Sequence, residues 1–187
     1  MKNNLLNILQ KYLQIFPEEK VRQVDVNKFL NNCEDTQIAD WNNFNGHIVV
    51  GGFIYAKKEN KFLVLYHKDL KMYLYPGGHF DINDKNPLDA VKREILEETS
   101  LDKLKQIIIA DDKLIPFDID THLIEYNERL DIPEHYHFEF RYLFTIDKIK
   151  DVKIETEEIS EYQWVDIKKL DYREISNKLE NLLMGEK

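Results

Sequence analysis

The chain has little of two things that many classes of protein require, cysteine and an excess of basic charge. Cys33 is the only cysteine among 187 residues, so an intrachain disulfide is excluded and no zinc framework can be built from cysteines. Lys and Arg number 26 against 35 Asp and Glu, which gives a formal net charge of −9. Bare nucleic acid and anionic membranes attract clusters of Lys and Arg. The balance therefore argues against a protein that is held to either surface by charge, and a reducing, cytoplasmic location fits.

Long apolar runs are lacking as well. Residues 1–16 place apolar side chains at helical spacing, without the continuous apolar region and the small-residue cleavage site of a secretory signal. No stretch further along the chain is long enough to cross a bilayer, so no membrane partner is expected. The length, with 43% hydrophobic and 33% charged residues, predicts one well-buried domain with a small extension.

A helical segment is expected at the N-terminus. Residues 2–16 predict an amphipathic helix that ends at Pro17, and its apolar side chains recur at about the helical period: Leu5, Leu6, Leu9, Leu13 and Phe16. A second helix is expected over residues 17–32, with an inner face made of Val21, Val24, Phe29 and Leu30. We therefore divide the chain into a helical extension, residues 1–40, packed on a domain of residues 41–187. The sequence leaves open whether the extension covers the sheet, shapes a substrate mouth or forms a homodimer contact.

Strands and helices alternate after residue 40. Short runs rich in β-branched and aromatic residues predict strands over residues 46–56, 61–67, 71–75, 104–110, 116–126, 135–146 and 159–167. Asn86 before Pro87 predicts a helix cap. The helix that follows, over residues 87–99, has an apolar stripe of Leu88, Val91 and Ile95, with Leu96 as a further candidate. A last helix is expected over residues 167–183. This order predicts an α/β (α+β) fold, and no internal repeat is evident.

Three glutamates gather negative charge on the helix over residues 87–99. Glu94, Glu97 and Glu98 stand at i, i+3 and i+4, so their carboxylates share one face. Each like-charged pair at this spacing costs about 0.2–0.5 kcal/mol, and acids in a last helical turn oppose the helix dipole. A solvated acidic face and a cation site are both open. The preceding PGGHFD, residues 76–81, favours the cation site, because two glycines in a turn let a backbone carbonyl or a phosphate approach closely. Carboxylate and carbonyl oxygens suit Mg²⁺ or Mn²⁺.

The same stretch resembles the signature of the Nudix hydrolases, which reads G, five residues, E, seven residues, then R-E-U-x-E-E-x-G-U with U an aliphatic residue. The matching positions are Gly78, Arg93, Glu94, Ile95, Glu97, Glu98 and Leu101. The chain departs from the signature in three ways: Asp84 stands at the early glutamate position, one residue is inserted ahead of Arg93, and Ser100 replaces the closing glycine. The resemblance covers about residues 46–166. It implies a Nudix-like α/β/α sandwich with a mixed β-sheet, preceded by the helical extension.

The resemblance also implies a reaction, in which water attacks one phosphorus of a diphosphate that links a nucleoside to another group. By position, Glu94, Glu97 and Glu98 would hold Mg²⁺ or Mn²⁺ together with the carbonyl of Gly77 or its neighbour. Glu94 or a later glutamate would polarise the water, and Arg93 would orient the carboxylates. Arg93 also fits a plain i,i+4 pair with Glu97, and the two interpretations are compatible. The expected partner is a small-molecule diphosphate or nucleotide.

Many members of the family add a catalytic glutamate in a loop just ahead of a strand that carries a tryptophan. Four acids precede Trp164 in this chain: Glu155, Glu157, Glu158 and Glu161. Glu158 has the best spacing for this role, and a solvated acidic loop is the alternative.

A strand with one polar face is the second candidate feature. In residues 134–144, His135, His137, Glu139 and Arg141 alternate with aromatic residues. A half-exposed strand explains this pattern, and a metal or phosphate site is the other explanation. Some Nudix members have a similar H-x-H-x-D-x-R-Y run at this point, which implies that His137, Glu139 and Arg141 contact the substrate.

Other histidines and acids receive weaker assignments. His79, after the double glycine, is expected either to contact substrate phosphate or to lie at the surface. Residues 118–122 contribute Asp118, Asp120 and His122 to an edge strand or to the hairpin partner of the histidine-rich strand, and no role is assigned to them. His47 and His67 are expected to be structural.

Three functions compete. The leading one is a soluble Mg²⁺-dependent Nudix hydrolase that cleaves a nucleoside-diphosphate-type bond. The alternative is a binding or regulatory module that keeps the fold without turnover, although REILEE, residues 93–98, retains every acid of the signature. An isomerase of isoprenoid diphosphates on the same fold would need a cysteine beside the metal site, and Cys33 lies far upstream. No motif identifies the substrate.

Overall fold

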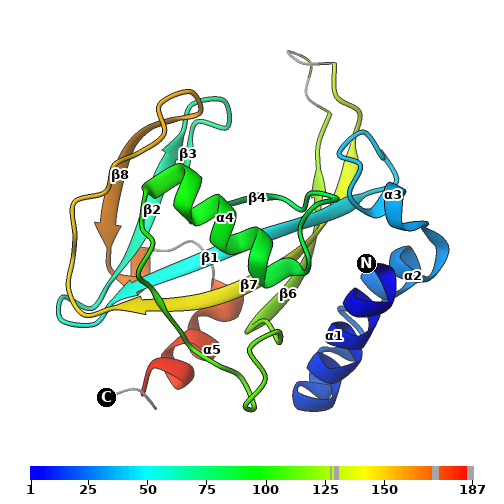
Figure 1. Ribbon diagram of the computed structural model, residues 1–187, viewed down its shortest axis with the longest axis horizontal. Helices are drawn as coiled ribbons and strands as arrows, with labels where there is room; N and C mark the ends of the chain where they lie inside the picture. The colour runs from blue at the N-terminus through cyan, green and yellow to red at the C-terminus, as the bar shows by residue number, and fades with distance from the viewer. Residues whose placement is uncertain (127, 129–130, 170–172, 185–187) are drawn as a thin grey trace. The chain divides into compact units, whose positions relative to one another are not determined.

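The computed structural model describes residues 1–126, 128, 131–169 and 173–184 (Figure 1). In these ranges the helices are α1 (Lys2–Ile15), α2 (Val24–Asn32), α3 (Asp35–Ile38), α4 (Pro87–Thr99) and α5 (Arg173–Met184), with short 3-10 helices at Pro17–Lys20 and Ile167–Lys169. The strands are β1 (His47–Ala56), β2 (Lys61–His67), β3 (Met72–Leu74), β4 (Gly77–His79), β5 (Lys105–Gln106), β6 (Asp118–Ile124), β7 (His135–Ile146) and β8 (Ile159–Val165).

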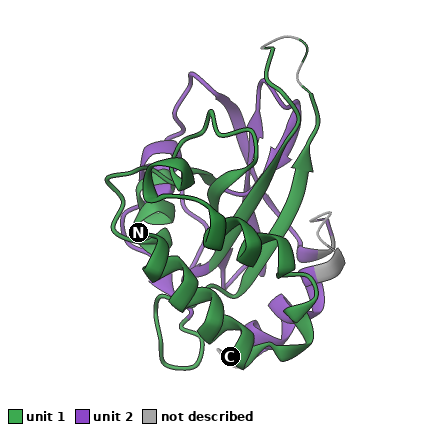
Figure 2. Ribbon diagram, turned by 90° about the vertical axis from the view of Figure 1, so that its right-hand side faces the viewer, with its two compact units in different colours: residues 1–51, 77–94, 108–142 green, residues 52–76, 95–107, 143–187 purple. Residues whose placement is uncertain are grey.

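The strands form one eight-stranded mixed sheet, which confirms the mixed α+β class. The hydrogen-bonded order is β3-β2-β1-β7-β5, with β4 beside β1, β6 beside β7 and β8 beside β2. The chain divides into two compact units (Figure 2), the first made of residues 1–51, 77–94 and 108–142 and the second of residues 52–76, 95–107 and 143–187. Among the described residues, no helix is both long and apolar enough to span a membrane.

The first unit contains the helical extension and the strand ends that carry the candidate site. Val49 and Val50 of β1 pair with His79 and Gly78 of β4. β6 and β7 pair over their facing lengths, from Asp118 opposite Arg141 to Ile124 opposite His135. The predicted hairpin partnership of these two strands is therefore confirmed. The largest buried side chains of this unit are Leu5, Ile8, Leu9, Tyr12, Leu30, Phe80, Phe117, Phe140 and Tyr142.

The second predicted helix begins later than expected. Residues 17–20 form a 3-10 turn with Pro17 at its start, and α2 follows only from Val24. Val21 and Val24, which we expected on the inner face, are 85% and 56% exposed. A helix that starts at residue 24 instead turns Val26, Phe29 and Leu30 inward, because these residues stand at i, i+3 and i+4.

Side chains of the extension contact the β6–β7 hairpin. Arg22 forms an ion pair with Asp118 at 2.5 Å, and the side-chain amide of Gln23 donates a hydrogen bond to the Ile119 carbonyl at 2.8 Å. The ring of Phe29 stacks on that of Phe138, with 4.6 Å between their centres. Residues 1–51 belong to the first compact unit as a whole. The division into residues 1–40 and 41–187 stays a prediction.

The second unit contains the other strand pairs. β2 pairs with β3 and β8, the end of β1 pairs with β2, and Lys105 and Gln106 of β5 pair with the end of β7. Its buried apolar side chains come mainly from these strands and from α5: Phe53, Phe62, Leu63, Val64, Leu65, Phe144, Ile159, Ile175, Leu179 and Leu183.

Four local predictions need correction. The double glycine of residues 77–78 lies in a short strand, β4, instead of a turn. The strand expected over residues 104–110 is limited to two residues. The last helix starts at Arg173 after a 3-10 turn, and residues 170–172 lie outside the described ranges. Leu96 is 49% exposed, whereas Leu88, Val91 and Ile95 are buried as predicted.

Candidate active site

Gly78 and Glu94 are in direct contact in the first unit. A Cβ atom built on Gly78 would lie 2.6 Å from Cδ of Glu94 and 2.7 Å from both of its carboxylate oxygens. Real Cβ atoms essentially never approach other heavy atoms so closely. Only glycine therefore lets this carboxylate rest against β4. Gly77 is more strictly confined, because its Cβ would lie 2.2 Å from the backbone carbonyl oxygen of Val50 in the paired strand.

Arg93 holds the Glu94 carboxylate from the other side. Its Nη1 donates to Oε1 of Glu94 at 2.8 Å, and its Nη2 donates to the carbonyl of His79 at 3.0 Å. Asp84 accepts two hydrogen bonds from the same guanidinium, from Nε at 3.2 Å and from Nη2 at 2.8 Å. The hydrogen bonds with Asp84 and the charge of Glu94 together raise the pKa of Arg93. An aspartate at this position therefore reaches the arginine despite its shorter side chain.

The Asp81–Asp84 turn and Ser100 account for two departures from the signature. The turn closes on itself, since the Asp81 amide donates to Oδ2 of Asp84 at 2.9 Å, and it presents Asp84 to Arg93. The inserted residue lies beyond this turn, because eight residues instead of seven separate Asp84 from Arg93. Ser100 has φ 56°, the left-handed conformation that favours glycine after a helix, and its amide donates to the Leu96 carbonyl at 2.9 Å.

Helix α4 brings the three glutamates together as predicted. The Asp89 amide donates to Oδ1 of Asn86 at 3.0 Å, which confirms the predicted cap. Glu94, Glu97 and Glu98 lie in the last two turns of one uninterrupted helix, where i, i+3 and i+4 residues share a face. Glu97 is exposed, and Glu94 and Glu98 are half-buried. Carboxylate oxygens are ligands that Mg²⁺ and Mn²⁺ prefer, and the roles of these glutamates and of the Gly77 carbonyl as metal ligands stay predictions.

The acidic loop ahead of Trp164 lies in the second unit. The Glu155 amide donates to the carbonyl of Glu98 at 3.1 Å, so this loop is attached to the last turn of α4. The Glu155 carboxylate accepts hydrogen bonds from the amides of Glu157 and Glu158, and these bonds lower its pKa. Glu158 is 70% exposed and lies 3.6 Å from Nε2 of His67. Its catalytic role stays a prediction.

The polar faces of β6 and β7 meet residue by residue. Three cross-strand pairs form one row: Asp118 opposite Arg141, Asp120 opposite Glu139, and His122 opposite His137. Asp118, Glu139 and Arg141 are buried. The alternation in residues 134–144 allowed a half-exposed strand. The structure contradicts this explanation, because neighbouring side chains cover the polar face of β7.

Arg141 is the cation at the centre of this row. Its guanidinium donates to Glu139 at 2.9 Å, to Asp118 at 3.0 Å and to Asp120 at 2.8 Å. Burial alone would raise the pKa of Asp120, but the hydrogen bond with His122 and the charge of Arg141 lower it to about 2. Asp118 and Asp120, to which we assigned no role, are the partners that this buried arginine needs. A direct substrate contact of Glu139 or Arg141 stays a prediction.

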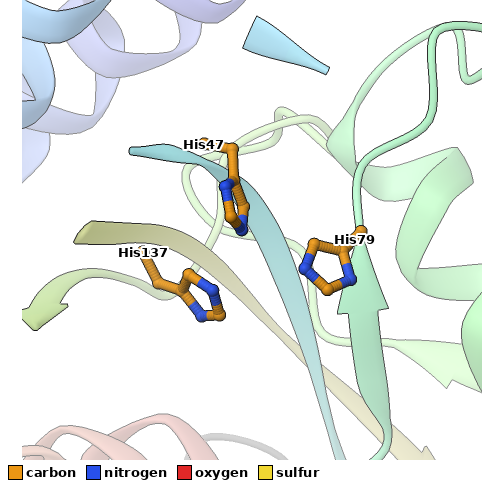
Figure 3. A group of neighbouring side chains, drawn as sticks. All are labelled: His47, His79 and His137. Atoms are coloured by element: carbon orange, nitrogen blue, oxygen red, sulfur yellow. The ribbon is translucent and has the colours of Figure 1, made fainter. Parts of the chain in front are cut away.

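Three histidine rings face one another beside this row (Figure 3). His47 of β1, His79 of β4 and His137 of β7 each offer a ring nitrogen within 4.8 Å of the others. The ring centres of His47 and His137 are 4.7 Å apart, and those of His47 and His79 are 5.0 Å apart. No local pattern in the sequence predicts that these three histidines meet, because they come from three strands that are distant along the chain. His47, expected to be structural, lies at the centre of the group.

Comparison with known proteins identifies a family for the part of the chain that includes Glu94, Glu97 and Glu98. A model of the NUDIX domain matches residues 46–183. The chain belongs to the Nudix family. A protein of Lactococcus lactis subsp. cremoris (strain MG1363), described as a probable DHNTP pyrophosphohydrolase, is 33% identical over 91 residues, which cover 49% of this chain and 50% of the relative. The chain thus spans about half the length of that curated relative.

Solved structures agree on the Nudix fold. A Nudix-family hydrolase from Clostridium perfringens has a TM-score of 0.55 at 25% identity, over 73% of this chain and 97% of the other. A C. elegans Ap4A hydrolase, solved as a binary complex, has a TM-score of 0.56 at 22% identity, over 74% of this chain and 98% of the other. The predicted membership of the Nudix family is therefore confirmed.

Proposed function

We propose that this Nudix protein is a Mg²⁺-dependent hydrolase that breaks a phosphoric anhydride bond by attack of water on phosphorus. The observation that carries the proposal is the position of Glu94, whose carboxylate rests on Gly78 and is held by the Arg93–Asp84 pair. Such a fixed carboxylate beside two more acids is unfavourable for folding alone, because like charges at helical spacing repel one another. It is favourable in a site that binds cations.

The donor set fits Mg²⁺ or Mn²⁺. Glu94, Glu97 and Glu98 would hold the ions together with the carbonyl of Gly77, since both metals prefer oxygen ligands. The space above Gly78, which a Cβ would fill, is what allows the Glu94 carboxylate to reach this position. When bound, the ions supply neutralisation of phosphate charge and a lower pKa for the attacking water.

The side chains of this protein supply orientation and a proton acceptor. Arg93 fixes the rotamer of Glu94 through the hydrogen bond from its Nη1 to Oε1. Glu94 or Glu158 takes the proton from the attacking water at a carboxylate oxygen. We assign Glu158 as the first candidate, because it is exposed and its loop is hydrogen-bonded to the last turn of α4.

Substrate phosphate or its leaving group would contact the histidine side of the first unit. His79 is the last residue of β4 and His137 lies near it, with 5.7 Å between their ring centres. Glu139 and Arg141 complete the substrate side from the row of charged residues behind His137. The L. lactis relative is described as a DHNTP pyrophosphohydrolase and the C. elegans structure as an Ap4A hydrolase. We infer a small nucleotide-like substrate with a phosphoric anhydride. A cytoplasmic location and a homodimer stay predictions.

Turnover of a diphosphate panel tests the function. The full-length protein with Mg²⁺ or Mn²⁺ is expected to release phosphate products from at least one compound. The double variant Glu97→Gln/Glu98→Gln is expected to lose at least about a hundredfold in kcat/KM, because the charge that holds the ions is removed. The double variant Glu18→Gln/Asp25→Asn changes the charge equally at exposed positions of the extension and is expected to retain activity.

Two results would count against the proposal. Activity that survives the Glu97→Gln/Glu98→Gln change would contradict the metal assignment. Absence of turnover for every compound with either ion would favour the alternative, a Nudix-fold module that binds nucleotides without hydrolysis.

A further inference from the structure

The group of His47, His79 and His137 is chemically different from the glutamate face. It offers three imidazole nitrogens, whereas the glutamate face offers oxygens. Imidazole is a ligand for Zn²⁺ and its transition-metal neighbours, and Mg²⁺ prefers oxygen. Any ion held by these histidines would therefore belong to another class of metal than the ion proposed for Glu94.

His47 provides the second, independent observation. The residue is 2% exposed, yet neither Nδ1 nor Nε2 has a hydrogen-bond partner among the residues that the structure describes. The backbone of Asn43 lies near the ring and favours its charged form, but it does not reach hydrogen-bond geometry. Buried polar groups without a partner are rare and call for an explanation such as an ion. Figure 3 shows this ring directed at the rings of His79 and His137.

His135 sets the tautomer of His137. Nδ1 of His135 lies 2.7 Å from the Pro133 carbonyl, and a carbonyl only accepts, so this nitrogen carries the proton. In a neutral ring, Nε2 of His135 then has a lone pair, and Nε2 of His137 donates to it at 3.2 Å. Nδ1 of His137 is thereby left with a lone pair. At metal sites, a hydrogen bond from the other ring nitrogen of a ligating histidine usually fixes its tautomer in this way.

We propose that His47, His79 and His137 bind one divalent transition-metal ion of the zinc class, separate from the magnesium site. Three imidazoles on one tetrahedral ion place their ring centres about 5 Å apart, given a Zn–N bond of about 2.0–2.1 Å. The centres here are 4.7, 5.0 and 5.7 Å apart. The ring nitrogens, within 4.8 Å of one another, need to approach by about 1.5 Å at most. Three ligands leave a fourth position for water or a substrate oxygen.

One further property suits such a site. His79 is exposed, which gives an ion a path of entry. A second candidate group, Asp120, His122 and Glu139, is already served by a cation, because Arg141 contacts both carboxylates. We therefore assign the ion to the histidines alone.

Binding of Co²⁺ and Zn²⁺ tests this proposal without any measurement of turnover. The full-length protein is stripped with a chelator and titrated with Co²⁺ in excess Mg²⁺, which occupies the glutamate face. We expect one Co²⁺ per chain, with the visible absorption of a tetrahedral ion, and its displacement by Zn²⁺. The histidine site does not depend on the proposed hydrolysis. A protein that binds Co²⁺ but hydrolyses nothing would therefore support the metal proposal and contradict the proposed function.

Variants localise the ion. His79→Ala and His137→Ala are expected to weaken Co²⁺ binding by at least about tenfold, since even an outer-shell partner contributes about 10–100-fold to metal affinity. His67→Ala, in the second unit, and Glu97→Gln/Glu98→Gln are expected to bind Co²⁺ like the unaltered protein. His79 is exposed, so its variant should fold, and far-UV circular dichroism of the metal-free protein checks this. Failure to bind Co²⁺ in excess Mg²⁺, unchanged binding by His79→Ala, or loss of binding in the glutamate variant would each overturn the proposal.

Discussion

Glu94 is held by three residues that precede it in the sequence, so small changes in these residues are expected to displace its carboxylate. Gly78 gives it room, and Arg93, fixed by Asp84, sets its rotamer. The Glu94 carboxylate is fixed both by the hydrogen bond from Arg93 and by its contact with Gly78. A change in either residue is therefore expected to shift it. If Glu94 acts as proposed, the residues that hold it are expected to affect catalysis even where they touch no substrate.

The Gly78→Ala variant tests this support. The added Cβ would overlap the Glu94 carboxylate at 2.6–2.7 Å, so Glu94 has to move. A displacement of about an ångström at a catalytic group reduces turnover by about a hundredfold. We expect kcat to fall by about that factor, with a far-UV circular dichroism spectrum like that of the unaltered protein. Lys92→Ala, at an exposed position on the same helix, serves as the control. A Gly78→Ala enzyme of normal kcat would show that the contact with Glu94 has no catalytic consequence.

Single residues also mark the limit of what the sequence predicts. The Nudix signature marks the positions of Asp84 and Arg93, but the shorter side chain of Asp84 and the inserted residue left their contact open, and the structure shows that it forms. The contact between His47 and His137 could not be predicted, since it depends on the pairing of distant strands and not on local spacing. His47 has ordinary neighbours in the sequence. Only its burial without a hydrogen-bond partner, a property of the folded chain, distinguishes it.

Among the elements, α4 and β4 show the same contrast. The bounds of α4 were predicted to the residue, because a cap, a proline and an apolar stripe are local signals. β4 was missed, because Gly77 and Gly78 have no strand propensity and become a strand through pairing with β1. In α2, apolar Val21 and Val24 misled the prediction, because the 3-10 turn at Pro17–Lys20 shifted the start of the helix.

Arg141 is the cation that three carboxylates of the β6–β7 hairpin share, and its loss is expected to be costly. Arg141→Ala removes a partner from Asp118, Asp120 and Glu139, although Arg22 still pairs with Asp118, which has no exposed surface. Removal of one member of a buried ion pair costs about 3–5 kcal/mol. We expect a loss of this size in the free energy of unfolding, measured by urea denaturation.

An exposed ion pair in the same unit provides the comparison. Lys11 pairs with Asp112 at 2.7 Å, with 46% and 30% of their side chains exposed. Such pairs contribute about 0–1 kcal/mol, so Lys11→Ala should change the free energy of unfolding little. Equal effects of Arg141→Ala and Lys11→Ala would mean that the charged row is not a buried network in solution.

At the scale of the whole molecule, three elements run from one compact unit into the other. β1 crosses between Gly51 and Gly52, α4 between Glu94 and Ile95, and β7 between Tyr142 and Leu143. Neither unit can unfold fully without loss of hydrogen bonds in elements that the other unit also uses. The two units are therefore expected to unfold as one cooperative system.

Native-state hydrogen exchange tests this coupling. We expect the slowest amides of the β6–β7 pair, in the first unit, and of the β2–β8 pair, in the second, to exchange with the same free energy of opening. Arg141→Ala alters only the first unit, yet it should reduce protection in β2 and β8 by the same factor as in β6 and β7. Lys11→Ala should leave both sets nearly unchanged. If β2 and β8 keep their protection while β6 and β7 lose it, the units open separately, and the continuity of β1, α4 and β7 does not transmit stability between them.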